Sequence, residues 1–375
     1  MPPFSPRDIY RRIRRHWSRK TLPDRKPPDR PYRVGWIVAD TLSGGPGDFS
    51  NLAPPSSMRV SQIANWLNEQ DTLIHNEMYV PDRTYDVVLF VKAMDETCQR
   101  ELERIRGYGG VTVFDANVNY YESWGEFDIP GTRPTDTLRD MALWMTREAN
   151  WIVADSTYLK EIIEPINKRV TVVPDNVDMN VYGTVKNHQS KDHVRLVWSG
   201  VAKKAVHLTL ITEAFQAFEN LELVLVSDEE PPVQKILEPH IPCRFIRFSE
   251  SSYAQALKDC DIIISPKRLN NSYAMAHTEY KITLGMATGL PAIASPQKSY
   301  VEAIGYKGGG CIAASTSEWV DALKMLSTDH HKRKDLGQRA HETVRDHYST
   351  AVIARRYGDL IVTLIKDRES RAAAR

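Results

Sequence analysis

Residues 194–204 read VRLVWSGVAKK, and this stretch indicates the fold most directly. Val194–Ser199 is an apolar run of strand length, Gly200 permits a tight turn, and a lysine pair stands just ahead of an expected helix at 208–218. The first half of the chain has the same order, with an expected strand at 34–39 followed by the glycine-rich run at 43–47. A strand, a glycine turn and a helix in each half predict an α/β protein built on parallel sheets.

The rest of the chain extends this alternation. We expect further strands at 86–91, Val111–Asp115, Trp151–Ala154, 170–173, 221–226, 261–265 and Ala292–Ala294. We expect helices at 57–69, 95–106, 137–149, 158–166, 253–258, 279–288, 318–326, 332–347 and 351–367. The polar run at 183–193 has no apolar period and marks a linker between two similar halves. Ligands bind outside the carboxyl ends of the strands in such sheets, so we expect the chemistry in a cleft between the halves.

Length and composition agree with this organisation. The chain has 375 residues, of which 42% are hydrophobic, and 49 Lys and Arg stand against 48 Asp and Glu. This length favours two domains, and the composition argues against disordered, collagen-like and coiled-coil chains. No apolar run is long enough for a membrane span, and the N-terminus lacks the apolar core of a signal peptide. The 4 widely spaced cysteines indicate reduced thiols in a cytoplasmic protein.

The formal net charge of +1 conceals a basic N-terminal arm, residues 1–33, with 11 Lys and Arg against three Asp. The arm therefore carries +8 and the remainder −7. Ile9, Tyr10, Ile13 and Trp17 recur at helical spacing among arginines, a pattern that favours an anionic membrane surface. A solvated basic arm, or a helix docked on the acidic body, is the alternative. No fold that reads bases follows the arm, so we expect no nucleic-acid partner.

Two glycine turns are candidates for binding phosphate. Gly44 and Gly45 follow the first strand, where glycines let backbone amides approach a phosphate closely. Gly200 and Lys204 occupy the matching place in the second half, and a lysine beside a helix N-terminus can receive a diphosphate. Strand-to-helix turns are often glycine-rich, however, and surface lysines are usually solvated.

Other polar groups gather near expected strand ends. His277, Glu279 and Lys281 crowd before an apolar helix, although a lone His or Glu is usually structural. Asp115 and Asn117 end a strand of the first half, either as a cap or as polar groups facing the cleft. Asp329-His330-His331 is a solvated run rather than a metal site, because adjacent histidines point apart. We therefore expect no bound metal.

The order and spacing of these stretches resemble the GT-B glycosyltransferases, especially the retaining glycosyltransferase family 4. The likeness runs from Val34 to Tyr357. ADSTYL at 154–159 and VTVVPDNVD at 170–178 are similar to the family's ADS…YL and V.VIPNGVD stretches. Residues 198–215, 221–227, 261–266, 284–295 and 299–302 match its following motifs in order. The chain departs from the family at Ala276 and Leu284, where two glutamates often stand, and at Val201, where an arginine does.

The resemblance implies two Rossmann-like parallel-sheet domains facing each other across a cleft. The expected parts are the arm with its Pro-rich linker at 1–31, an acceptor domain at 32–182, the linker at 183–193, a donor domain at 194–347, and a C-terminal helix at 348–375 that packs back on the acceptor domain.

The resemblance also implies site residues. Lys204, Lys281 and Asp115 would be catalytic, and Asn117 would face the acceptor. The nucleotide-sugar would contact Gly44, Gly45, Ser199, Gly200, Ser227, His277, Glu279 and Glu302.

The implied reaction is sugar transfer from a nucleotide-sugar donor to a glycan or lipid-linked acceptor, with retention and without metal or cofactor. Together with the arm, this predicts a cytoplasmic enzyme of polysaccharide biosynthesis, peripheral on the inner face of a membrane. Two alternatives stay open: a nucleotide-sugar epimerase of the same fold, and a GT-B body that binds its donor without catalysis.

Overall fold

The computed structural model describes residues 31–38, 49, 52, 57–70, 73–81 and 83–374. Its contacts divide the chain into two compact units. Unit 1 comprises Met1–Asn117, Trp144–Val153 and Ala354–Arg375, and unit 2 comprises Val118–Leu143 and Ala154–Ile353. Residues 1–30 of the arm, and Gly44 and Gly45, lie outside the described residues, so the expectations for them stay predictions.

The first sheet has six strands in the order β2-β1-β3-β4-β5-β6. They are β1 (Tyr32–Val38), β2 (Ile74–Met78), β3 (Val87–Val91), β4 (Val111–Asp115), β5 (Trp151–Ala154) and β6 (Val170–Val172). The sequence did not reveal β2, whose letters IHNEM lack the apolar run of a buried parallel strand. Its polar side chains are paired internally: Trp36 Nε1 donates to Asn76 Oδ1 (3.0 Å), and Arg83 binds the Glu77 carboxylate (2.9 Å).

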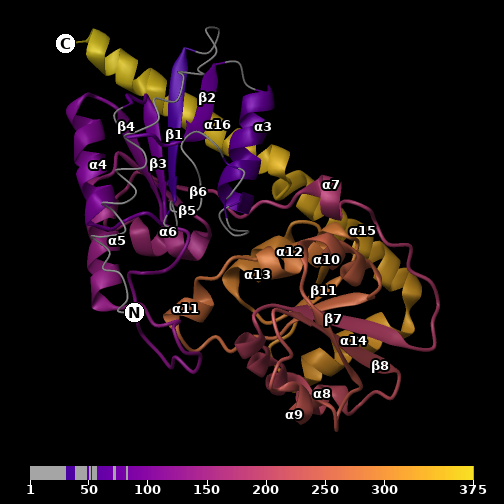
Figure 1. Ribbon diagram of the computed structural model, residues 1–375. Coiled ribbons are helices and arrows are strands. Elements are labelled where there is room, and N and C mark those ends of the chain that lie inside the picture. Colours follow the sequence, from indigo (N-terminus) through magenta and orange to yellow (C-terminus); the bar gives the residue numbers. More distant parts are fainter. Residues whose placement is uncertain are drawn as a thin grey trace, which may run out of the picture. The chain divides into compact units, whose positions relative to one another are not determined.

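Four helices complete this part of the chain. They are α3 (Gln62–Gln70), which follows a π-helical turn at Ser57–Ser61, α4 (Glu96–Gly107), α5 (Asp136–Glu148) and α16 (Thr350–Ala373). The yellow helix α16 lies along the first sheet in Figure 1, where Tyr357 packs against Trp36 with ring centroids 5.6 Å apart. Nearer its end, Arg368 Nη2 donates to Asp86 Oδ1 (2.8 Å). The end of the chain is therefore part of unit 1.

The second sheet has the order β12-β11-β10-β7-β8-β9 and its paired strands are parallel. Its strands are β7 (Val194–Ser199), β8 (Leu221–Ser227), β9 (Cys243–Arg247), β10 (Ile262–Ser265), β11 (Ala292–Ala294) and β12 (Gly310–Ile312). The edge strands β9 and β12 were not expected, since one is half polar and the other has three residues. The two parallel sheets confirm the predicted α/β class.

The remaining helices are mostly short, with two longer ones near the end of unit 2. They are α6 (Thr157–Ile163), α7 (Met179–Tyr182), α8 (Thr212–Phe215), α9 (Gln234–Leu237), α10 (Glu250–Lys258), α11 (Ser272–Met275), α12 (Tyr280–Ala287), α13 (Lys298–Gly305), α14 (Thr316–Thr328) and α15 (His330–His347). The single helix expected at 208–218 is instead a 3-10 helix, η3 (Ala202–Ile211), followed by α8. Its buried residues Ala202, Ala205, Leu208 and Ile211 recur every third position, which matches three residues per turn.

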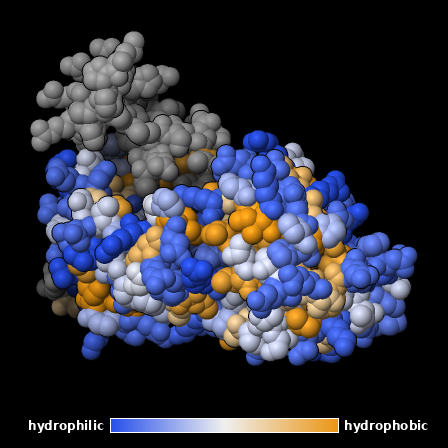
Figure 2. All heavy atoms as spheres, turned by 90° about the horizontal axis from the view of Figure 1, so that it is seen from below, coloured by the Kyte–Doolittle hydropathy of each residue, from blue (hydrophilic) through white to orange (hydrophobic). Residues whose placement is uncertain are grey.

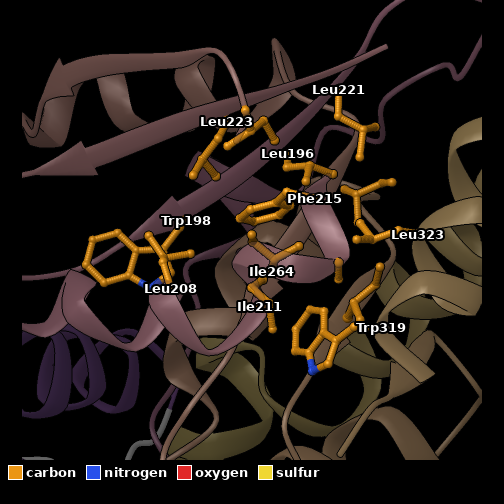
Figure 3. Packing of buried hydrophobic residues seen from close by; sticks show 14 of the residues in the cluster. Leu196, Trp198, Leu208, Ile211, Phe215, Leu221, Leu223, Ile264, Trp319 and Leu323 are labelled. Atoms are coloured by element: carbon orange, nitrogen blue, oxygen red, sulfur yellow. The ribbon is translucent and has the colours of Figure 1, made fainter. Parts of the chain in front are cut away.

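Two apolar clusters form the core of unit 2, because β7 is buried on both faces. Leu196 and Trp198 belong to one cluster and Val197 to the other. Figure 3 shows the side chains of Leu196, Phe215 and Ile264 gathered between the strands and the surrounding helices. Burial of one such side chain contributes about 1.5–3 kcal/mol, so these clusters hold the ends of β7 and β10 in place.

The segment at 183–193 is part of unit 2 and contains neither helix nor strand, although all of it is described. Lys186 N donates to the Thr288 carbonyl (2.9 Å), and Lys191 Nζ pairs with the buried Asp261 (2.8 Å). On the face drawn in Figure 2, hydrophobic residues form separate patches among hydrophilic ones. Among the described residues, the helices include none with the length and apolarity needed to cross a membrane.

Candidate functional site

A pocket of about 260 Å³ opens within unit 2 beyond the carboxyl ends of β7 and β10. Its lining comes from the turn after β7 and from η3, from the end of β10 and the loop after it, from α11 and the start of α12, from α13, and from a segment before α5: Gly200, Val201, Lys204, His207, Ser265, Pro266, Lys267, Asn270, Asn271, Tyr273, Ala274, His277, Thr278, Lys281, Tyr300, Asp128, Ile129 and Thr132. Both strand ends are fixed by the apolar clusters, so the loops that follow them are held in position. A crevice beyond the strand ends is where parallel sheets bind ligands.

One wall of the pocket is a segment that we call the strap, residues 122–132. Gly125 forms an isolated antiparallel bridge with Asn271, and Glu126 binds the side chain of Asn270 (2.9 Å). Asp128 pairs with Arg268 (2.5 Å). The strap thus ties down the loop between β10 and α11.

Lys204 reaches into this pocket from η3. Its ammonium donates to the Tyr273 hydroxyl (2.9 Å) and lies 3.3 Å from His277 Nε2. The Tyr273 and His277 rings meet edge to face, with centroids 4.2 Å apart. These contacts fix the ammonium at the pocket wall.

Lys281 approaches from the first turn of α12. Its Nζ lies 4.6 Å from the centroid of the Trp198 ring, a cation–π contact. Gly200 makes room for it, because a Cβ at that position would lie 3.0 Å from Nζ. Burial, followed by the nearby charge of Lys204, lowers the pKa of Lys281 to about 7.

A third lysine, Lys267, follows β10 and was not among the expected site residues. Its ammonium donates to Gln297 and lies 5.7 Å from the centroid of the Tyr300 ring. Burial lowers its pKa well below the usual value, and the charges of Lys281 and Lys204 lower it further. Burial also lowers the pKa of His207 to about 4 and that of His277 well below its usual value, with the lysines acting in the same direction.

The structure brings Gly200, Lys204, His277 and Lys281 together at the pocket, while the other expected residues lie elsewhere. Ser199 accepts from the Tyr253 hydroxyl (2.5 Å), and Ser227 donates to Asp228 (2.9 Å). Neither residue lines the pocket, although both end strands of the second sheet.

Glu279 and Glu302 lie together in an acidic cluster outside the pocket lining. Glu279 is buried, and its Oε1 has no hydrogen-bond partner among the described residues. Burial raises its pKa well above the usual value, and the charges of Asp175, Asp155 and Glu302 raise it further. Glu302 accepts a hydrogen bond from Thr157.

Asp115 lies in unit 1 with its carboxylate fully buried. Arg59 Nε donates to Oδ2 (2.9 Å), Arg59 Nη2 donates to Oδ1 (3.1 Å), and the Tyr357 hydroxyl donates to Oδ2 (2.5 Å). Asn117, two residues on, has a positive φ of 47°. The geometry shows Asp115 joining β4, α16 and the π-helical turn inside unit 1.

Sequence reasoning missed Lys267, Tyr273 and the whole strap. Lys267 stands where the expected strand 261–265 has just ended, so its position after a buried strand was an available signal. The strap carries no apolar periodicity, and only its pairing in space shows its role. Among the described residues, no group of three or more His, Cys, Asp or Glu is placed to hold a metal.

No protein-family model and no curated protein sequence matches the chain. Solved structures do match. Sucrose-phosphate synthase from Thermosynechococcus elongatus superposes with a TM-score of 0.67 and 13% identity over 90% of this chain and 100% of that one. Anabaena HepE in complex with UDP and glucose superposes with a TM-score of 0.63 and 12% identity, over 88% of this chain and 100% of that one. A glycosyltransferase from Rickettsia africae superposes with a TM-score of 0.58 and 13% identity, over 89% of this chain and 98% of that one. This chain therefore has the GT-B fold of these glycosyltransferases, built from two parallel six-stranded sheets with their helices.

Proposed function

We propose that this protein transfers a sugar from a nucleotide-sugar donor to an acceptor, and that the basic pocket of unit 2 holds the donor's diphosphate. The observation that carries the proposal is the meeting of Lys204, Lys267 and Lys281 in one pocket without an ion pair to any described carboxylate. Asp128, the one carboxylate in the described lining, is paired with Arg268. Such a pocket favours a compact polyanion.

The chemistry of glycosyl transfer uses this charge. As the bond to the anomeric carbon breaks, negative charge develops on the departing diphosphate, and fixed ammonium groups stabilise it. We assign this role to Lys204 and Lys281, which their neighbours Tyr273 and Trp198 hold in place. Because the lysines supply the positive charge, the proposal needs neither a metal nor a cofactor.

The resemblance to family 4 supports finer proposals. We expect retention at the anomeric carbon and an acceptor that is a glycan or a lipid-linked sugar of polysaccharide biosynthesis. The arm's charge of +8 supports a cytoplasmic enzyme at the inner face of a membrane.

One observation favours a second candidate, a protein that binds the donor without transferring it. Ala276 and Leu284, which match the family's two donor-site glutamates, are 4% and 6% exposed and offer no polar side chain to a ligand. Loss of those groups would leave donor binding to the lysines while removing contacts to the sugar.

Ligand binding and turnover test both candidates. Calorimetry with UDP, GDP and ADP and their nucleotide-sugars identifies the donor, and release of the nucleoside diphosphate with a panel of acceptors measures transfer. We expect Lys204→Ala to reduce transfer by about 100-fold, because it removes a charge aimed at the leaving group. The control is Lys235→Ala, which removes an exposed lysine of α9 outside the pocket lining and should change transfer by less than about twofold.

The outcomes separate the candidates. Unchanged transfer in a folded Lys204→Ala variant contradicts the assignment of the donor site. Tight binding without turnover across all acceptors favours the donor-binding protein. An epimerised sugar formed from donor alone identifies an epimerase.

A further inference from the structure

The pocket contains one lysine more than an ordinary diphosphate requires. A nucleotide-sugar with a neutral sugar carries two negative charges, both on the diphosphate, and Lys204 and Lys281 can balance them. Lys267 is then left in a half-buried position without a counter-charge. A buried charge without a partner is costly, so Lys267 favours its neutral form without ligand, and a third negative charge on the ligand would stabilise its ammonium form.

Lys267 also occupies a place of its own within the pocket. Lys204 contacts Tyr273 and His277, and Lys281 contacts Trp198. Lys267 comes from the loop after β10 and contacts Gln297 and the Tyr300 ring instead. The three ammonium groups therefore have different partners within one pocket.

The orientation of Lys267 is fixed by its neighbours. The amide oxygen of Gln297 accepts the hydrogen bond from Lys267, and the amide nitrogen of Gln297 donates to the Ser299 hydroxyl (2.7 Å) and to the His277 carbonyl. The Tyr300 hydroxyl bonds Ser265 (3.0 Å), which holds the ring beside the ammonium. An ammonium has three donors, and among the described residues Gln297 is the hydrogen-bond acceptor shown for this one. The remaining donors are free for a ligand.

We propose that the protein takes a nucleotide-sugar whose sugar bears a carboxylate, a hexuronate donor, and that Lys267 binds this group. The inference rests on the proposed function, since it concerns the sugar end of the same donor. A carboxylate would form a charge-assisted hydrogen bond with the oriented ammonium, whereas the hydroxymethyl group of a neutral hexose would leave the charge unbalanced. The described pocket lining presents no unpaired carboxylate that would repel it.

Matched pairs of donors test this proposal. UDP-glucose and UDP-glucuronate differ only in the group at the sugar's terminal carbon, and so do GDP-mannose and GDP-mannuronate. Calorimetry measures the affinity of the full chain for each compound and for the free nucleoside diphosphate. We expect the uronate of the preferred base to bind at least about tenfold more tightly than its neutral partner, a difference of about 1.4 kcal/mol.

Substitutions of Lys267 test whether this residue is responsible for the preference for the uronate donor. Lys267→Met should abolish the preference for the uronate while changing the affinity for the free nucleoside diphosphate by less than about threefold. Lys267→Arg keeps the charge and should retain part of the preference. Lys235→Met, which removes an exposed lysine of α9, is the control for a general loss of charge. Circular dichroism establishes that each variant is folded.

Two results overturn the proposal. Equal affinity of the unmodified protein for the neutral and the anionic donor removes the need for a third charge on the sugar. An equal loss of affinity for free diphosphate and uronate in Lys267→Met makes Lys267 a diphosphate ligand. Failure of the proposed function looks different, because then no nucleoside diphosphate binds, or binding does not depend on Lys204.

Discussion

Among single residues, Lys281 shows most clearly how the pocket is prepared for an anion. Its ammonium lies over the Trp198 ring and close to the space that Gly200 leaves open. Burial and the neighbouring charge of Lys204 bring its pKa down to about 7, so without ligand the charged form is disfavoured. An anion that enters the pocket stabilises the charged form and raises this pKa again.

The affinity for a nucleotide-sugar should therefore depend on pH. Between the free pKa of about 7 and the higher pKa of the complex, Lys281 takes up a proton on binding, so affinity falls as pH rises. From about pH 6.5 to 8.5 we expect the logarithm of the affinity to decline with a slope approaching one per pH unit. The ligand's diphosphate diester does not titrate in this range. Calorimetry at several pH values measures the slope.

The control for this prediction is Lys281→Met, in which the contribution of this group to the slope disappears. Lys267, His207 and His277 face the same space, so any slope that persists belongs to them. An affinity that stays constant or rises with pH in the unmodified protein would contradict the coupling.

The sequence predicted part of the site at the residue scale. Lys204 and Lys281 could be found because each stands at a fixed place relative to a strand or an apolar helix. Lys267 was missed although it follows an expected strand, since its importance comes from its contacts with Gln297 and Tyr300, which lie 30 and 33 positions further along the chain. The contacts of Asp115 with Arg59 and Tyr357 were hidden for the same reason.

Among the elements, the strap has the greatest influence on the pocket. Gly125 has a φ of +89° and forms a β-bridge with Asn271. A Cβ added at Gly125 would lie 2.0 Å from the Asn270 carbonyl oxygen. Gly131 has a φ of +78° in the same segment, but a Cβ there would meet nothing within 4 Å. Both glycines have a left-handed backbone conformation, but only Gly125 lacks the space for a side chain.

Alanine at these two positions should separate backbone strain from packing. Gly131→Ala forces a side chain into a left-handed conformation and should cost about 1–2 kcal/mol. Gly125→Ala adds a clash with the backbone of the loop before α11, so the strap must move and donor affinity should fall by at least about tenfold. Thermal unfolding and calorimetry on both variants measure the two effects. Equal donor affinity in the two variants would show that the strap does not hold the pocket.

Elements with a clear apolar period were predicted well, and the exceptions have physical reasons. Strand β2 was hidden because Asn76 and Glu77 are buried with polar partners. Helix η3 begins six residues before the expected start, since its apolar period is three. The strap has no period at all, and its hydrogen bonds join residues far apart in the chain.

At the scale of the whole molecule, the proposed membrane contact and the proposed donor site belong to different parts of the chain: the basic arm and the pocket of unit 2. The arm's charge of +8 contrasts with −7 on the remainder, so we expect the arm to account for any attraction to anionic lipid. We expect the full chain to bind vesicles that contain an anionic lipid and to be released when salt shortens the range of electrostatic attraction. Co-sedimentation with vesicles measures the bound fraction.

Deletion of residues 1–31 is the matched variant for this test. It should remove vesicle binding and leave the affinity for the donor unchanged, because the pocket lies entirely within unit 2. Undiminished binding of the shortened chain to the same vesicles would place the membrane contact on another surface.

The position of helix α16 determines the order in which the two units can finish folding during synthesis. Residues from 354 onward belong to unit 1, where Tyr357 joins Asp115 and Arg368 joins Asp86. During synthesis a ribosome releases all of unit 2 before these residues emerge. The part of the protein made first is thus the last to be completed, and until then the nascent chain presents a sheet that α16 does not yet cover and that a chaperone could shield.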